Sequence, residues 1–122
     1  MTRIVIIGGG PGGYEAALVA AQLGAQVTVV ERDGPGGACV LTDCVPSKTL
    51  IATSVRKQAL LDASSVGVHF DGGPDGDTGG VIADMSLVNK RVKELAHAQS
   101  ADITARLAAE GVEVIHAEGR LV

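Results

Sequence analysis

The chain has 122 residues and a formal net charge of −4, and 46% of its residues are hydrophobic while only 2% are aromatic. This length suits one domain, and the apolar content argues against disorder. The negative charge argues against nucleic acid or an anionic membrane as a partner. No apolar run approaches the roughly 18 residues that span a bilayer. The N-terminus lacks the pattern of a signal peptide, so we expect a cytoplasmic protein.

The first 31 residues predict a strand, a helix and a second strand. Residues 3–7 are a β-branched run typical of a buried parallel strand, and residues 26–30 predict a second strand that ends at Glu31. The alanine-rich stretch 14–23 between them predicts a helix, which Gly24 is expected to end. This βαβ unit predicts the α/β class, a Rossmann-like parallel sheet with helices on both faces.

The middle of the chain predicts a loop at residues 33–37 and then a helical segment from the region of residues 37–44 to about Leu61. Residues 64–80 are rich in glycine and aspartate, and they predict a flexible surface loop. The spacing of Asp71, Asp75 and Asp77 misses the EF-hand pattern, which argues against a calcium site.

The last part of the chain predicts a long helix and a third strand. Apolar residues recur with helical spacing from Met85 to Glu110, Gly111 is expected to end the helix, and residues 112–115 predict the strand. The histidines, His69, His97 and His116, lie at no motif spacing, and we expect them to be structural or solvated.

A glycine fingerprint stands between the first strand and the first helix. Gly8, Gly10 and Gly13 have the G-x-G-x-x-G spacing, in which the glycines allow a tight turn, approach to a pyrophosphate and close helix–strand packing. Glu31 follows Gly13 by 18 residues, where an acid can accept hydrogen bonds from a ribose diol. The pattern predicts a dinucleotide site, but it does not distinguish FAD from NAD.

The two cysteines, Cys39 and Cys44, are five residues apart. Cα atoms at that spacing in an ideal helix are about 8.7 Å apart, whereas a disulfide needs roughly 4.4–6.8 Å. A bridge therefore requires a distorted turn, which Pro46 would favour. A strained, easily reduced bridge suits catalysis. Metal binding has too few ligands, and two buried free thiols are the structural alternative.

Taken together, the fingerprint, the acid after the second strand and the segment Gly-Gly-x-Cys-x4-Cys-Val-Pro-Ser-Lys at residues 36–48 resemble the FAD-dependent pyridine nucleotide–disulfide oxidoreductases, and most of all dihydrolipoamide dehydrogenases. The resemblance runs along the whole chain. It implies a Rossmann-like FAD-binding domain, with FAD as cofactor and NAD(P)H as co-substrate.

The resemblance also implies roles for individual residues. Cys44 is expected to be the thiol beside the flavin, and Cys39 the thiol that attacks a disulfide substrate. Lys48 would approach the flavin ring. The other residues expected to hold FAD are Gly8, Gly10, Pro11, Gly13, Glu31, Arg32, Gly36, Gly37, Ala38 and Gly119.

The sequence departs from the family between the cysteines. The usual Leu-Asn-Val-Gly segment is replaced by residues 40–43, Val-Leu-Thr-Asp, which sets Asp43 beside Cys44 and disfavours thiolate. A branch that resembles NAD(P)H:quinone reductases carries a similar stretch. The acceptor is therefore either a small-molecule disulfide or a quinone.

The family continues beyond the length of this chain through the rest of the FAD domain, an NAD(P) domain and a dimerisation domain. We therefore expect residues 1–122 to be the N-terminal part of an FAD-binding domain whose full-length protein is a homodimer. An alternative from another class is a nucleotide-binding module whose cysteines sense redox state without turnover.

Overall fold

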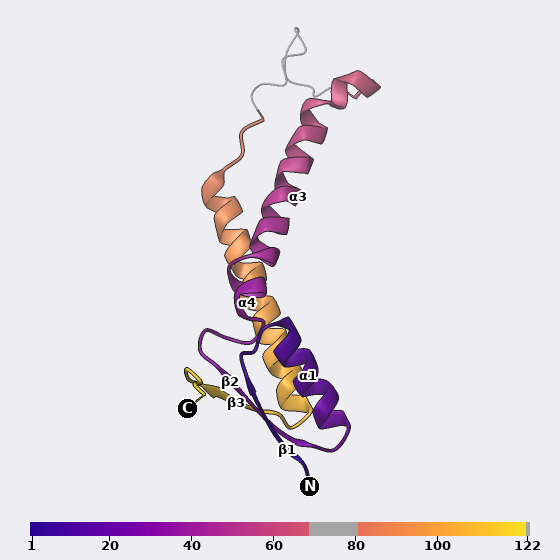
Figure 1. Cartoon of the computed structure of the whole chain (residues 1–122). Coiled ribbons are helices and arrows are strands. Elements are labelled where there is room, and N and C mark those ends of the chain that lie inside the picture. Colours follow the sequence, from indigo (N-terminus) through magenta and orange to yellow (C-terminus); the bar gives the residue numbers. More distant parts are fainter. Residues whose placement is uncertain (69–80, 122) are drawn as a thin grey trace.

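The computed structural model describes residues 1–68 and 81–121, and it forms a three-stranded parallel sheet from which two long helices extend (Figure 1). The strands are β1 (Arg3–Ile7), β2 (Gln26–Glu31) and β3 (Glu113–His116), in the order β1-β2-β3. Helix α1 (Pro11–Gln22) joins β1 to β2, and helix α4 (Met85–Ala109) leads into β3. The predicted Rossmann-like parallel sheet is confirmed.

Two helices, α2 (Gly37–Leu41) and α3 (Cys44–Leu61), take the place of the continuous helical segment that the sequence predicted. The break falls at Thr42 and Asp43, which lie between the cysteines. A 3-10 helix (Ala63–Val66) occupies the start of the predicted surface loop. The rest of that loop, with its three aspartates and His69, lies outside the described residues. No helix in the described part of the chain is long and apolar enough to cross a membrane.

The core lies between the sheet and the helices α1 and α4. Strand pairing aligns Ile4 with Val27 and Ile6 with Val29, and these residues share one face of the sheet because side chains alternate along a strand. Val29 and Leu107 are the largest side chains that are fully buried among the described residues. The other buried residues that pack in the same cluster are Ala17, Leu18, Val27, Val40, Ile103 and Val112.

Helices cover only one face of this sheet, so the prediction of helices on both faces is corrected for the described residues. The connections from β1 to β2 and from β2 to β3 both run in the same direction across the sheet. Because such connections are right-handed, α1 and α4 lie on the same face of the sheet, where they contact each other (Figure 1). Apolar residues remain exposed on the opposite face, where Val5 is 67% exposed and Ile7 is 49% exposed.

The core predicts a clear contrast between two leucine substitutions. Leu107→Ala removes a fully buried side chain and leaves a cavity between α4 and the sheet, so it should lower the free energy of unfolding by about 3 kcal/mol. Leu23→Ala changes a side chain that is 83% exposed and should cost less than about 0.5 kcal/mol. Urea unfolding of both variants measures the difference, and equal losses would place the core elsewhere.

Candidate functional site

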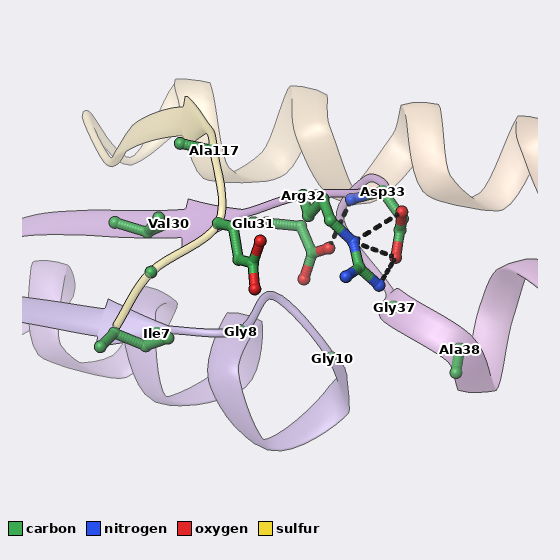
Figure 2. A pocket seen from close by; sticks show the side chains of 12 residues that line it. Ile7, Gly8, Gly10, Val30, Glu31, Arg32, Asp33, Gly37, Ala38 and Ala117 are labelled. Carbon is green, nitrogen blue, oxygen red and sulfur yellow. Dashed lines mark hydrogen bonds and ion pairs between the residues drawn. The ribbon is translucent and has the colours of Figure 1, made fainter. Parts of the chain in front are cut away.

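A cavity of about 350 Å³ opens where β1 and β2 end, between the glycine loop, the start of α2 and the residues that follow β3 (Figure 2). The segment after β3 is fastened there by the Ala117 N–H, which donates to the Glu31 carbonyl oxygen at 3.2 Å. Seven of the residues predicted to hold a cofactor line this cavity: Gly8, Gly10, Glu31, Arg32, Gly37, Ala38 and Gly119. Sequence reasoning missed the other lining residues, which are Ile7, Val30, Asp33, Ala117 and Glu118.

The glycine loop brings the N-terminus of α1 to the cavity. A Cβ atom on Gly13 would lie 1.9 Å from the Gly8 carbonyl oxygen, so only glycine allows the helix to pack this closely on the loop. A Cβ on Gly10 would meet no protein atom within 4 Å, because the space beside it is open. Gly10 is the N-cap residue of α1, and no side chain caps this end of the helix. The backbone N–H groups of the first turn are therefore available to an anion.

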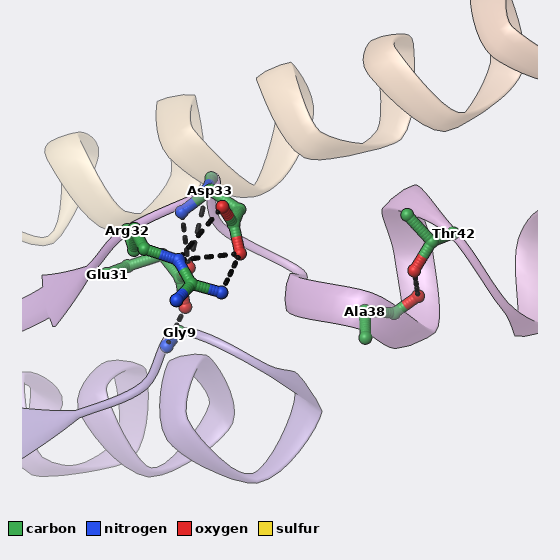
Figure 3. A network of polar contacts seen from close by, with 7 residues as sticks. Gly9, Glu31, Arg32, Asp33, Ala38 and Thr42 are labelled. Carbon is green, nitrogen blue, oxygen red and sulfur yellow. Dashed lines mark hydrogen bonds and ion pairs between the residues drawn. The ribbon is translucent and has the colours of Figure 1, made fainter. Parts of the chain in front are cut away.

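The Glu31 side chain accepts hydrogen bonds from three backbone N–H groups (Figure 3). Its Oε2 accepts a hydrogen bond of 2.6 Å from the Gly9 N–H, and its Oε1 accepts from the N–H groups of Asp33 at 2.8 Å and Gly34 at 3.4 Å. Burial by itself raises the pKa of Glu31, but the backbone N–H donors outweigh burial and hold the pKa below its ordinary value. Oε2 retains a lone pair for a further donor, such as a ribose hydroxyl.

Arg32 and Asp33 form an exposed ion pair at the edge of the cavity (Figures 2 and 3). The Arg32 Nη2 lies 3.0 Å from the Asp33 Oδ2, and the Arg32 Nε donates to Oδ1 at 3.1 Å. The two contacts hold the guanidinium plane in one orientation. Arg32 was predicted to be a cofactor residue, and its partner Asp33 was not.

The loop between β2 and α2 is fixed at two points. The Gly36 N–H donates to the Gly9 carbonyl oxygen at 2.7 Å, and the Ser100 hydroxyl donates to the Pro35 carbonyl oxygen at 2.6 Å. A Cβ on Gly37 would lie 3.0 Å from the Gly10 Cα, so the two glycine-rich loops are in close contact. Nothing in the sequence pointed to Ser100, because it lies 65 positions away on α4.

The cysteines flank the break between α2 and α3. Cys39 is half-buried in α2, Cys44 is exposed at the start of α3, and both are free thiols. A hydrogen-bonding interaction with Cys44 is the largest of the causes that raise the pKa of the Cys39 thiol, followed by burial. A disulfide bridge was expected to need a distorted helical turn, which Pro46 would favour. The helix is interrupted at Thr42 and Asp43, and Pro46 lies inside the first turn of α3.

Four predicted cofactor residues do not line the cavity. Pro11, Gly13 and Gly36 adjoin it through their neighbours in the glycine loops. Lys48 is exposed and instead lines a hollow between α3 and α4, together with Arg56 and Arg91. Lys48 therefore lies outside the lining of the glycine-loop cavity.

Comparison with known proteins identifies the family. The model of the pyridine nucleotide-disulphide oxidoreductase family matches residues 2–122, so the chain belongs to this family.

Individual relatives agree with this assignment. An NAD(P)H dehydrogenase (quinone) from Mycobacterium tuberculosis is 52% identical over the whole chain, which covers 24% of that protein. A dihydrolipoyl dehydrogenase from Geobacillus stearothermophilus is 31% identical over 99% of the chain, which covers 24% of that protein. The crystal structure of LpdA from M. tuberculosis matches 100% of the chain and 25% of its own, with 50% identity and a TM-score of 0.86. The chain thus spans about a quarter of the length of these relatives.

The bonding of Glu31 predicts a pH-dependent contribution to stability. Glu31→Gln removes the charge and one acceptor oxygen, so it should lower the free energy of unfolding by about 1–2 kcal/mol at pH 7. Because the folded pKa of Glu31 lies below its unfolded value, this contribution is present above the unfolded pKa and is lost as the pH falls through the folded pKa. Urea unfolding at pH 7 and at lower pH should show the difference between the two proteins shrinking under acid. Glu15→Gln, at an exposed position of α1, is the control and should show no such difference; a gap that persists in acid would contradict the assigned role.

Proposed function

We propose that this chain is the N-terminal, FAD-binding part of a flavoprotein oxidoreductase that passes electrons from NAD(P)H through FAD to Cys39 and Cys44. The observation that carries the proposal is that α2 begins in the wall of the cavity and bears the first cysteine. Gly37 and Ala38 line the cavity, and Cys39 is the next residue. A dinucleotide held by the glycine loop would therefore extend toward the thiols.

The residues present fit the adenosine and pyrophosphate portions of FAD. The uncapped N-terminus of α1 and the open space beside Gly10 suit a pyrophosphate, which is stabilised by unpaired amides and the helix dipole. The Glu31 carboxylate lines the same cavity and suits a ribose diol. Gly119 also lines the cavity, and a Cβ there would lie 2.9 Å from the Ile7 side chain, so a glycine lets this segment pack closely on β1. We assign the adenine end to Gly119 and Arg32.

In this proposal the cofactor, when bound, accepts a hydride from NAD(P)H and delivers two electrons onward. The chain supplies two thiols in unequal settings. Cys44 is the first residue of α3 and is exposed, and it is the thiol that we place beside the flavin. Cys39 is the thiol that attacks a disulfide substrate, breaking its S–S bond and forming a mixed disulfide. Lys48, one turn beyond Cys44, is the residue that we place near the flavin ring.

The second candidate function is reduction of a quinone directly by the flavin. It is favoured by Asp43, which adds a negative charge next to the cysteines, and by the M. tuberculosis relative that is 52% identical, which is an NAD(P)H dehydrogenase (quinone). For either acceptor we propose a cytoplasmic homodimer with a small-molecule substrate and no nucleic acid or membrane partner.

A redox sensor without turnover is the remaining alternative; a full-length protein that binds NAD but no flavin would support it.

Two glycine substitutions test the cofactor site. Gly10→Ala adds a methyl group that meets no protein atom, so the fold should be unchanged, but the methyl enters the space proposed for the pyrophosphate. We expect the FAD affinity of the full-length protein to fall by about tenfold or more, the equivalent of roughly 1.4 kcal/mol. Gly12→Ala is the matched control, because its Cβ also meets no atom and Gly12 does not line the cavity. Flavin fluorescence titration measures both, and equal affinities would place the cofactor elsewhere.

A cysteine substitution separates the two acceptors. Cys39→Ser in the full-length protein should abolish turnover of lipoamide or a related disulfide, because it removes the attacking thiol. Quinone reduction with NAD(P)H should survive, since electrons then leave from the flavin. Steady-state assays with each acceptor measure the split. If both activities fall together, direct reduction of quinones is ruled out.

A further inference from the structure

One polar residue, Ser100, lies on the face of α4 that packs against the core. The buried residues of this helix are Ala96, Ile103 and Leu107, which stand four residues before, three after and seven after Ser100. With 3.6 residues per turn, these four side chains share one face of the helix. Ser100 itself is half-buried. Packing alone would favour an apolar residue here, so the hydroxyl requires a polar partner.

The partner belongs to the loop between β2 and α2. The Ser100 hydroxyl donates to the Pro35 carbonyl oxygen at 2.6 Å, across 65 positions of the sequence. Residues 34–37 are all buried, and a buried backbone carbonyl needs a hydrogen-bond donor. Because proline has no N–H, the carbonyl is the one backbone group by which a hydrogen bond can hold Pro35. The loop therefore depends on α4 for this contact.

The same hydroxyl lies beside Gly34. A Cβ on Gly34 would lie 3.3 Å from the Ser100 Oγ and 3.5 Å from the Leu41 Cδ1, so the loop passes between α4 and α2. Gly34 has a φ of +137°, which favours glycine. The Gly34 N–H donates to the Glu31 Oε1 at 3.4 Å. The loop is thus held at Gly34 by the end of β2 and, one residue later, by Ser100.

Pro35 is connected through the next two residues to the wall of the glycine-loop cavity. The Gly36 N–H donates to a carbonyl oxygen of the glycine loop at 2.7 Å. Gly37 and Ala38 then line the cavity, whereas Ser100 does not. Any effect of Ser100 on a bound molecule therefore passes through the position of this loop.

We propose that Ser100 is a positioning residue of the dinucleotide site, whose hydrogen bond to Pro35 holds the cavity wall at Gly37 and Ala38 in place before the cofactor binds. A preorganised wall lowers the cost of ordering the loop on binding. Without the hydroxyl, the loop loses its tie to α4, and part of the binding free energy goes into ordering it. The identity of the ligand rests on the proposed function, whereas the order of the loop can be measured without any ligand.

The first experiment measures cofactor affinity in the full-length protein. Ser100→Ala should weaken the binding of FAD by about fivefold, as expected for the loss of one hydrogen bond, and Ser100→Thr, which keeps a hydroxyl, should stay within about twofold of the unchanged protein. Thr104→Ala is the matched control, because it removes a hydroxyl one turn further along α4 that donates to the Ser100 carbonyl oxygen and is exposed. Flavin fluorescence titration measures all three. Unchanged affinity in Ser100→Ala, or equal losses in Ser100→Ala and Thr104→Ala, overturns the proposal.

The second experiment separates positioning from a general loss of stability. Leu107→Ala changes a fully buried side chain on the same face of α4, so it should lower the urea midpoint more than Ser100→Ala does. The affinity of the folded Leu107→Ala protein for FAD should nevertheless stay within about twofold, because Leu107 is not bonded to the loop by its side chain. If the loss of affinity instead follows the loss of stability across the two variants, Ser100 has only a structural role.

The third experiment uses the full-length protein without cofactor. Hydrogen exchange followed by mass spectrometry should show residues 33–40 exchanging about fivefold faster in Ser100→Ala than in Thr104→Ala, with the exchange of α1 unchanged. Equal exchange of residues 33–40 in the two variants overturns the proposal. A full-length protein that binds no FAD contradicts the proposed function instead, and the exchange of this loop still decides whether Ser100 positions it.

Discussion

The site depends on a single carboxylate. Glu31 ends β2 and accepts backbone hydrogen bonds from Gly9 in the glycine loop and from Asp33 and Gly34 in the loop that leads to α2. Two loops are thereby fixed to the end of one strand. Charge-assisted hydrogen bonds of this kind are among the stronger ones in proteins, and a buried carboxylate without them would be costly. The shape of the cavity follows from these bonds.

The same constraint positions the thiols. Once the loop after β2 is held to Gly9 and to Ser100, α2 starts at the cavity, and its short length places Cys39 close to the wall. The chain then turns at Thr42 and Asp43, so that Cys44 opens a new helix near Cys39 rather than continuing the first one. The glycine-loop cavity and the two cysteines are therefore brought together by loop geometry more than by the sheet.

The described residues leave apolar surface uncovered. Val5, Ile7 and Ile115 are exposed on the sheet face opposite α1 and α4, and α3 has no buried residue. Parallel sheets are usually covered on both faces, because crossover helices occur on each side. This exposed face supports the proposal that the chain works as part of a longer protein, and the relatives it matches are about four times as long.

The sequence by itself determined the βαβ unit, the third strand, the glycine loop and the family, because strand periodicity, glycine spacing and the cysteine motif are local features. Only the tertiary structure decided that both crossover helices share one face, that α2 and α3 are separate, that Lys48 lies with Arg56 and Arg91, and that Ser100 holds Pro35. These features arise from contacts between residues far apart in the chain or from the path of a turn. Local patterns in the sequence carry no signal for either.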